Sequence, residues 1–303
     1  MTSARTQRRR PVRVRYAVLA AMALSATPAL SLAANDVLYE RALMSAAGER
    51  CGLFAAPVGA ALAAGRAQAR NAALRGGADP ADLSAVEARA RATAQRTACN
   101  SADLQQAAER IRSAFQGYAA MMRMNYPGDL ADWRADRNDG RAQRWRLAQE
   151  AQFGPDRMTF GLAGREGEGV LLAVGVFADG RTPYAARLVM RDPGRSLGPY
   201  LDRRGAASLR RLPLAKRMPP SALATFTAEA RSRAGADLAG KDADRAWAFR
   251  FPAAAALRLS ELDPREAVAV EFLFAGRKDE TRRAYVEVGD FAAGRAFLQT
   301  ARR

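Results

Sequence analysis

Carboxylates are the side chains best suited to do chemistry in this 303-residue chain, because it contains no histidine. Glu261, Asp263 and Glu266 lie close together in the sequence. A glycosidase uses two carboxylates about 5 to 9.5 Å apart on either side of a sugar. Such a pair would make the protein a carboxylate-based hydrolase. The segment 262–266 also has the composition of a turn that leads into a strand, which is the simpler interpretation.

A second pair of acids, Glu271 and Glu287, falls on two alternating segments that predict neighbouring strands. Both lie opposite the valine and phenylalanine rows, so we expect them on the polar face of the sheet. There they would form ion pairs with Arg250 or Arg283, each contributing less than about 1 kcal/mol. An acidic pair that binds a ligand is the alternative.

The composition excludes several classes of site. Without histidine the chain cannot build a Ser-His-Asp or Cys-His nucleophile system, a His-based zinc site or a histidine general base. Its two cysteines, Cys51 and Cys99, are too few for a cysteine-rich metal site. The aspartates between Asp129 and Asp139 lack the spacing of a calcium loop. We therefore expect no metal, no cofactor and no enzymatic activity.

Positive charge is densest in one stretch that is rich in proline and glycine, here called the basic segment. It consists of Arg203, Arg204, Arg210, Arg211, Lys216 and Arg217. Guanidinium groups pair well with carboxylate and phosphate, and the net charge of +17 favours encounters with anions. The basic segment would bind an anionic envelope glycan or lipid, and the alternative is a solvated loop. We expect no specific binding of nucleic acid.

The first 34 residues have the layout of a secretory signal peptide. Six arginines between Arg5 and Arg15 precede an uncharged stretch over 17–34. Ser31 and Ala33 fit the small-x-small pattern of a cleavage site, so residues 1–33 predict a signal peptide cleaved near Ala33. A retained anchor is the alternative, but a spanning helix needs about 20 strongly apolar residues. The mature protein would be periplasmic or secreted, with no transmembrane segment.

Residues 34–125 predict an antiparallel helical hairpin. They are rich in alanine, arginine, glutamine, glutamate and leucine, and their apolar positions recur every three or four residues. A glycine pair at 76–77 would end one helix. Asp79 would then cap the next helix, with Pro80 as its first residue. This combination indicates a turn between two helical arms.

Two points in the arms stay open on sequence alone. Pro57 either kinks the first arm or begins a new helix. Residues 80–125 form one helix or two, because Ser101 can cap a fresh one. The two cysteines lie at equal distances from residue 75, so folding the chain at the turn would bring them level. We therefore predict a Cys51–Cys99 disulfide.

Residues 126–144 predict a linker, and residues 145–303 predict an antiparallel β domain. Beyond the linker the apolar period changes from 3.6 to two, which is typical of half-buried strands. The alternating rows cover 158–162, 170–176, 184–190, 247–251, 268–274 and 284–288. Short helices are expected over 252–259 and 291–301. The fold class is then α+β, with a β-sandwich or a partly open β-barrel as the second domain.

The function expected from these features is a secreted or periplasmic bacterial envelope protein that acts as a non-enzymatic binding or assembly module. It would present a sheet surface or the hairpin to an envelope partner that the sequence does not identify. Binding of an anionic polymer through the basic segment is the alternative, and a carboxylate-based hydrolase is a weaker one. An exposed apolar face on the hairpin would favour the first interpretation. A contiguous arginine patch would favour the second, and a cleft lined by facing carboxylates the third.

Overall fold

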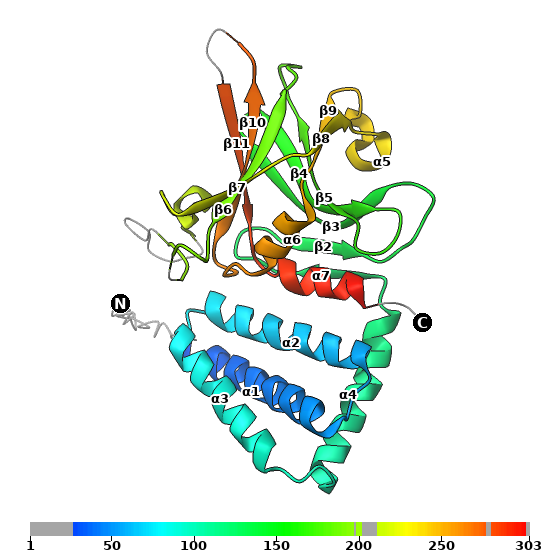
Figure 1. Cartoon of the computed structure of the whole chain (residues 1–303), viewed down its shortest axis with the longest axis vertical. Coiled ribbons are helices and arrows are strands. Elements are labelled where there is room, and N and C mark those ends of the chain that lie inside the picture. The colour runs from blue at the N-terminus through cyan, green and yellow to red at the C-terminus, as the bar shows by residue number, and fades with distance from the viewer. Residues whose placement is uncertain (1–26, 197, 202–210, 277–279, 301–303) are drawn as a thin grey trace, which may run out of the picture.

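The structure of the chain, a computed structural model, describes residues 27–300 apart from 197, 202–210 and 277–279. It has the expected α+β fold, in which a helical part packs against a part made of two antiparallel sheets (Figure 1). The helical part consists of α1 (Thr27–Cys51), α2 (Ala56–Arg75), α3 (Pro80–Arg96) and α4 (Ala102–Ala120). No helix in this range is both long and apolar enough to cross a bilayer.

The helix ends follow the local signals in the sequence. The Asp79 carboxylate accepts a hydrogen bond from the backbone N–H of Ala81 at 2.7 Å, and Pro80 is the first residue of α3. This confirms the predicted turn. Pro57 lies in the first turn of α2 and so begins a new helix there. Ser101 stands at the N-cap of α4, so residues 80–125 hold two helices.

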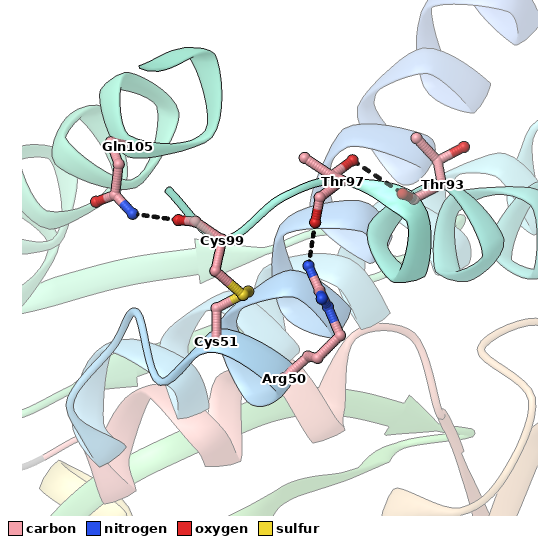
Figure 2. Close-up of a disulfide and its surroundings, with 6 residues drawn as sticks. All are labelled: Arg50, Cys51, Thr93, Thr97, Cys99 and Gln105. Carbon is pink, nitrogen blue, oxygen red and sulfur yellow. Dashed lines mark hydrogen bonds between the residues drawn. A yellow bond between two sulfur atoms is a disulfide. The ribbon is translucent and has the colours of Figure 1, made fainter. Parts of the chain in front are cut away.

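The predicted Cys51–Cys99 disulfide is present and joins the end of α1 to the loop after α3 (Figure 2). The two Cα atoms are 5.6 Å apart. Two hydrogen bonds lie beside it. The side-chain amide of Gln105 donates to the Cys99 carbonyl at 2.6 Å, and Arg50 donates to the Thr97 carbonyl. The loop between α3 and α4 is therefore held by both α1 and α4.

The two helices that flank the predicted turn, α2 and α3, run in opposite directions, since Arg70 of α2 pairs with Glu87 of α3 at 3.0 Å, so the expected antiparallel hairpin is present. The sequence did not predict the course of α1 beside them. Leu38 of α1 shares a core cluster with Leu83 of α3, and further along both helices Ala47 shares a cluster with Ala94. α1 and α3 therefore run side by side in the same direction. The reason is the break after α1, where Gly52 adopts a φ of +62°. The chain folds back there, and α2 returns it before α3 begins.

Two antiparallel sheets form the β part, and their apolar faces pack together as a sandwich. The first sheet has the order β1 (Arg123–Tyr126), β2 (Trp133–Asp136), β3 (Arg144–Phe153), β4 (Asp156–Gly164), β5 (Val170–Val176), β9 (Ala246–Arg250) and β8 (Ala230–Arg233). The second has the order β11 (Glu280–Glu287), β10 (Ala267–Phe274), β6 (Ala185–Arg191) and β7 (Leu223–Thr227). All six predicted rows are strands.

The segment predicted as a linker, 126–144, contributes to the first sheet instead. β2 lies inside it and pairs with β1 on one side and β3 on the other. The Trp133 side chain is fully buried against Phe291, and its indole N–H donates to the Val288 carbonyl at 2.9 Å. The β part therefore begins near residue 123. The strand was missed because four residues are too few to show an alternating period.

Three short helices complete the β part: α5 (Ala236–Ala239), α6 (Ala253–Ser260) and α7 (Phe291–Gln299). The second and third agree with the predicted helices over 252–259 and 291–301. In Figure 1, α7 lies between the sheets and α2, so it forms the junction between the two parts. The position of α7 determines where the helical part meets the sandwich.

Candidate binding groove

The acids over 261–266 are either bound to arginines or exposed. Glu266 is buried and accepts two hydrogen bonds from Arg191, at 2.5 and 3.0 Å. Asp263 accepts two from the guanidinium group of Arg265, at 2.8 and 2.9 Å, and one from its backbone N–H at 3.0 Å. Glu261 is exposed. None of the three acids lines either of the two hollows described below.

The second pair of acids, Glu271 and Glu287, is not a pair in the structure, because each binds different partners. Glu271 lies between Arg187 and Arg283 on the two strands beside β10, and Arg187 is 2.8 Å away. The expected pair with Arg283 is thereby confirmed. Glu287 is different, because its side chain is 0% exposed although we expected it at the surface. The loop after β1 folds over it and covers what would otherwise be the polar face of the strand.

Glu287 binds this loop through the backbone. Its carboxylate accepts hydrogen bonds from the N–H groups of Asp129, Leu130 and Ala131, at 2.6, 2.8 and 3.1 Å. Arg217 completes the arrangement from the other side, 3.1 Å from the Asp129 carboxylate and 3.4 Å from that of Glu287. Burial raises the pKa of Glu287, whereas these N–H groups and Arg217 act in the opposite direction. The cluster holds the loop against the sandwich.

Only part of the basic segment lies on the described surface. Arg203, Arg204 and Arg210 are outside the described residues. Arg211 and Lys216 are exposed, whereas Arg217 is fully buried and pairs with internal carboxylates. Arg217 is therefore unavailable to an external anion. Within the described chain the basic segment does not form a contiguous arginine patch.

An apolar groove lies in the helical part, between α1, α2 and α4, and reaches the edge of the sandwich at β1 and α7. Its volume is about 640 Å³, within the range of small-molecule sites. The larger apolar side chains that line it are Leu43, Met44, Val58, Leu62, Ile111 and Phe115. An exposed apolar face on the helical part is the feature that would favour the first functional interpretation.

The groove lies along α4 between contacts that hold the two ends of this helix. Near its start, Leu104 and Ala108 pack in a cluster with α1 and α3. At its end, Arg137 donates to the Tyr118 carbonyl at 3.2 Å and to the Phe297 carbonyl at 2.7 Å. Alanines on the facing sides of α2 and α4 fill little space. In the middle of α4, Ile111 packs against the α1 cluster and Arg112 donates to the Leu53 carbonyl at 3.0 Å, so the groove is the space that the small alanine side chains leave beside these contacts.

Two polar groups stand out in the lining of the groove, one on Arg41 and one on Tyr126. The Arg41 guanidinium donates to the Gly65 carbonyl of α2, and burial lowers its pKa. The Tyr126 side chain is only 2% exposed, and its hydroxyl has no hydrogen-bond partner among the described residues. Burial, with a smaller contribution from Tyr118, raises the pKa of Tyr126 so that its hydroxyl stays protonated.

A second hollow, of about 760 Å³, lies on the outer face of the first sheet. Most of its charged side chains already pair with one another, as Arg134 does with Glu150 and Arg157 with Asp242. A ligand there would have to compete with these pairs. The groove of the helical part is the better candidate, since its polar groups have fewer partners.

The groove was not predicted from the sequence. Its signal is the apolar face of α4, where Ile111, Phe115 and Tyr118 lie on one side of the helix. This apolar face is wider than packing against a single helix requires. Within the described residues no group of cysteines and acids could hold a metal ion. The chain matches no protein-family model, no curated protein and no solved structure.

Proposed function

We propose that this protein is a non-enzymatic binding module of the bacterial envelope that takes the apolar chain of a small ligand into the groove between α1, α2 and α4. The observation that carries the proposal is the groove itself, with its aliphatic and aromatic lining. Sites for small molecules are mostly apolar hollows with a few polar groups, and this groove has that composition.

A small ligand is preferred over a protein partner because of the size of the hollow. A stable interface between proteins buries about 800 Å² on each partner. The groove is a hollow of about 640 Å³ lined by residues of four helices and one strand. A single apolar chain fits such a space better than an extended protein surface does.

The envelope location rests on two features of the chain. The first 33 residues have the layout of a signal peptide, which would direct the protein to the periplasm or the medium. The Cys51–Cys99 disulfide suits an oxidising compartment. Both features support a protein that meets its ligand outside the cytoplasm.

The proposal is tested with the neutral fluorescent probe N-phenylnaphthylamine and two variants on α4. Ala114 is exposed and lines the groove, so Ala114→Trp should fill the groove without disturbing the core. Ser113 is exposed beside it and does not line the groove, so Ser113→Trp is the matched control. We expect the wild-type protein and Ser113→Trp to bind the probe equally, and Ala114→Trp to bind it at least tenfold more weakly. Absent binding, or equal binding to all three, would overturn the proposal.

A further inference from the structure

Arg41 lies in the wall of an apolar groove, and the acid that acts on its charge is the exposed neighbour Glu40, which does not contact it. Among the described residues it makes no ion pair, and its one hydrogen bond goes to the Gly65 carbonyl. Most of the five N–H donors of Arg41 are thus left to a ligand.

Several arginines that are less exposed than Arg41 form ion pairs with carboxylates. Arg75, Arg191 and Arg217 each have a side chain less than a tenth exposed, and each pairs with a carboxylate. Removing a guanidinium from water is costly unless an anion or several acceptors replace the water. A ligand that covers Arg41 with an apolar chain would have to supply that anion itself.

The charge of the groove indicates which anion. The charged side chains that line it are Arg41, Arg110 and Glu40, which sum to one positive charge. A carboxylate carries one negative charge and fits the fork of a guanidinium with two parallel hydrogen bonds. A phosphate monoester carries about −1.5 to −2 and would leave excess negative charge. A carboxylate therefore balances the groove best.

We propose that the groove binds a single-chain amphiphile with a carboxylate head, of the long-chain fatty acid class, with its head on Arg41 and its chain against Leu62, Ile111 and Phe115. This inference rests on the proposed function and names its ligand. The Tyr126 hydroxyl is buried beneath the wall of the groove, so the contact with the head group is assigned to Arg41 alone.

The experiment compares ligands that share one chain and differ in the head: dodecanoate, dodecanol and dodecyl phosphate. Each is titrated against the bound neutral probe in the wild-type protein, in Arg41→Gln and in the control Arg91→Gln. Arg91 is exposed on α3 and does not line the groove. We expect wild type and Arg91→Gln to bind dodecanoate roughly tenfold or more tightly than dodecanol, and Arg41→Gln to bind the two equally. Arg41→Lys should keep part of the preference, because it keeps the charge and loses the fork.

The outcomes separate this inference from the proposed function. Equal binding of dodecanoate and dodecanol to the wild type would overturn the role of Arg41 and leave the apolar groove standing. So would a preference that survives in Arg41→Gln. Tighter binding of dodecyl phosphate than of dodecanoate would replace the carboxylate by a phosphate head. Binding of none of the three would refute the proposed function itself. Unchanged binding of dodecanol to Arg41→Gln shows that this variant is folded.

Discussion

Arg75 at the end of α2 and Asp290 before α7 form a two-bond ion pair that joins the helical part to the sandwich. The two guanidinium nitrogens of Arg75 lie 2.8 and 3.1 Å from the two carboxylate oxygens of Asp290. Asn71, one turn earlier on α2, donates to the same carboxylate at 3.0 Å. Asp290 has no exposed surface, so its charge depends on these partners.

Replacing Arg75 by alanine should lower the free energy of unfolding by about 3 to 5 kcal/mol, because it leaves the Asp290 carboxylate buried with less compensation. Urea denaturation measures the change, and hydrogen exchange should show α2 and α7 less protected. Arg70→Ala is the control, since the Arg70–Glu87 pair is partly exposed. Its removal should cost about 1 kcal/mol or less. Equal losses in the two variants would contradict the role given to Arg75.

Arg217 offers a second prediction, because it belongs to the basic segment in the sequence and to the interior in the structure. Arg217→Ala should cost about 3 to 5 kcal/mol, since it leaves Asp129 and Glu287 as unpaired neighbouring acids. Arg211, an exposed member of the same segment, is the control. Arg211→Ala should change stability by no more than about 0.5 kcal/mol. A loss for Arg211→Ala as large as that for Arg217→Ala would be evidence against a buried cluster.

The disulfide should account for a large share of the stability of the helical part. It closes a separation of 48 residues, for which chain entropy predicts about 4 kcal/mol. The double variant Cys51→Ser, Cys99→Ser should lose an amount of that order in thermal or urea unfolding. A reducing agent should lower the stability of the wild-type protein and leave the double variant unchanged. Equal stability of the oxidised wild type and the double variant would refute the estimate.

Arg282 should make the stability depend on pH in the acid range. It donates to Asp179 at 2.5 Å and to Glu280 at 2.7 Å, and these hydrogen bonds lower the pKa of both acids below 3.8 and 4.5. An acid with a lower pKa in the folded state stabilises the fold above its unfolded pKa. That contribution is lost as the pH falls through the folded pKa.

The measurement compares wild type with Arg282→Gln by urea denaturation at about pH 7 and about pH 3. The variant should be less stable at the higher pH, and the difference should shrink at the lower pH as the acids become protonated. In the variant the pKa of both acids, followed by NMR, should rise towards their ordinary values. Arg91→Gln should parallel the wild type at both pH values. A stability difference that stays constant would rule out this linkage.

Several parts of the fold could be predicted from the sequence because they depend on neighbouring residues. The turn before α3 needs only glycine, Asp79 and Pro80 in order. The strands that we predicted show the alternation of a face against the core, which any local window reveals. The sequence did not predict β3, and the reason is also local. A register shift between Trp145 and Leu147 breaks its period, and Arg146 is buried there.

Other features of the protein depend on contacts between distant segments, so only the tertiary structure decided them. The period of β11 correctly places Glu287 opposite the apolar row, but the loop after β1 covers that position. A local pattern gives the side of a strand on which a residue lies, and it does not tell what packs against that side. The same holds for the helices. The sequence alone predicted the disulfide, whereas the parallel course of α1 and α3 and the groove beside Arg41 arise from how four helices pack.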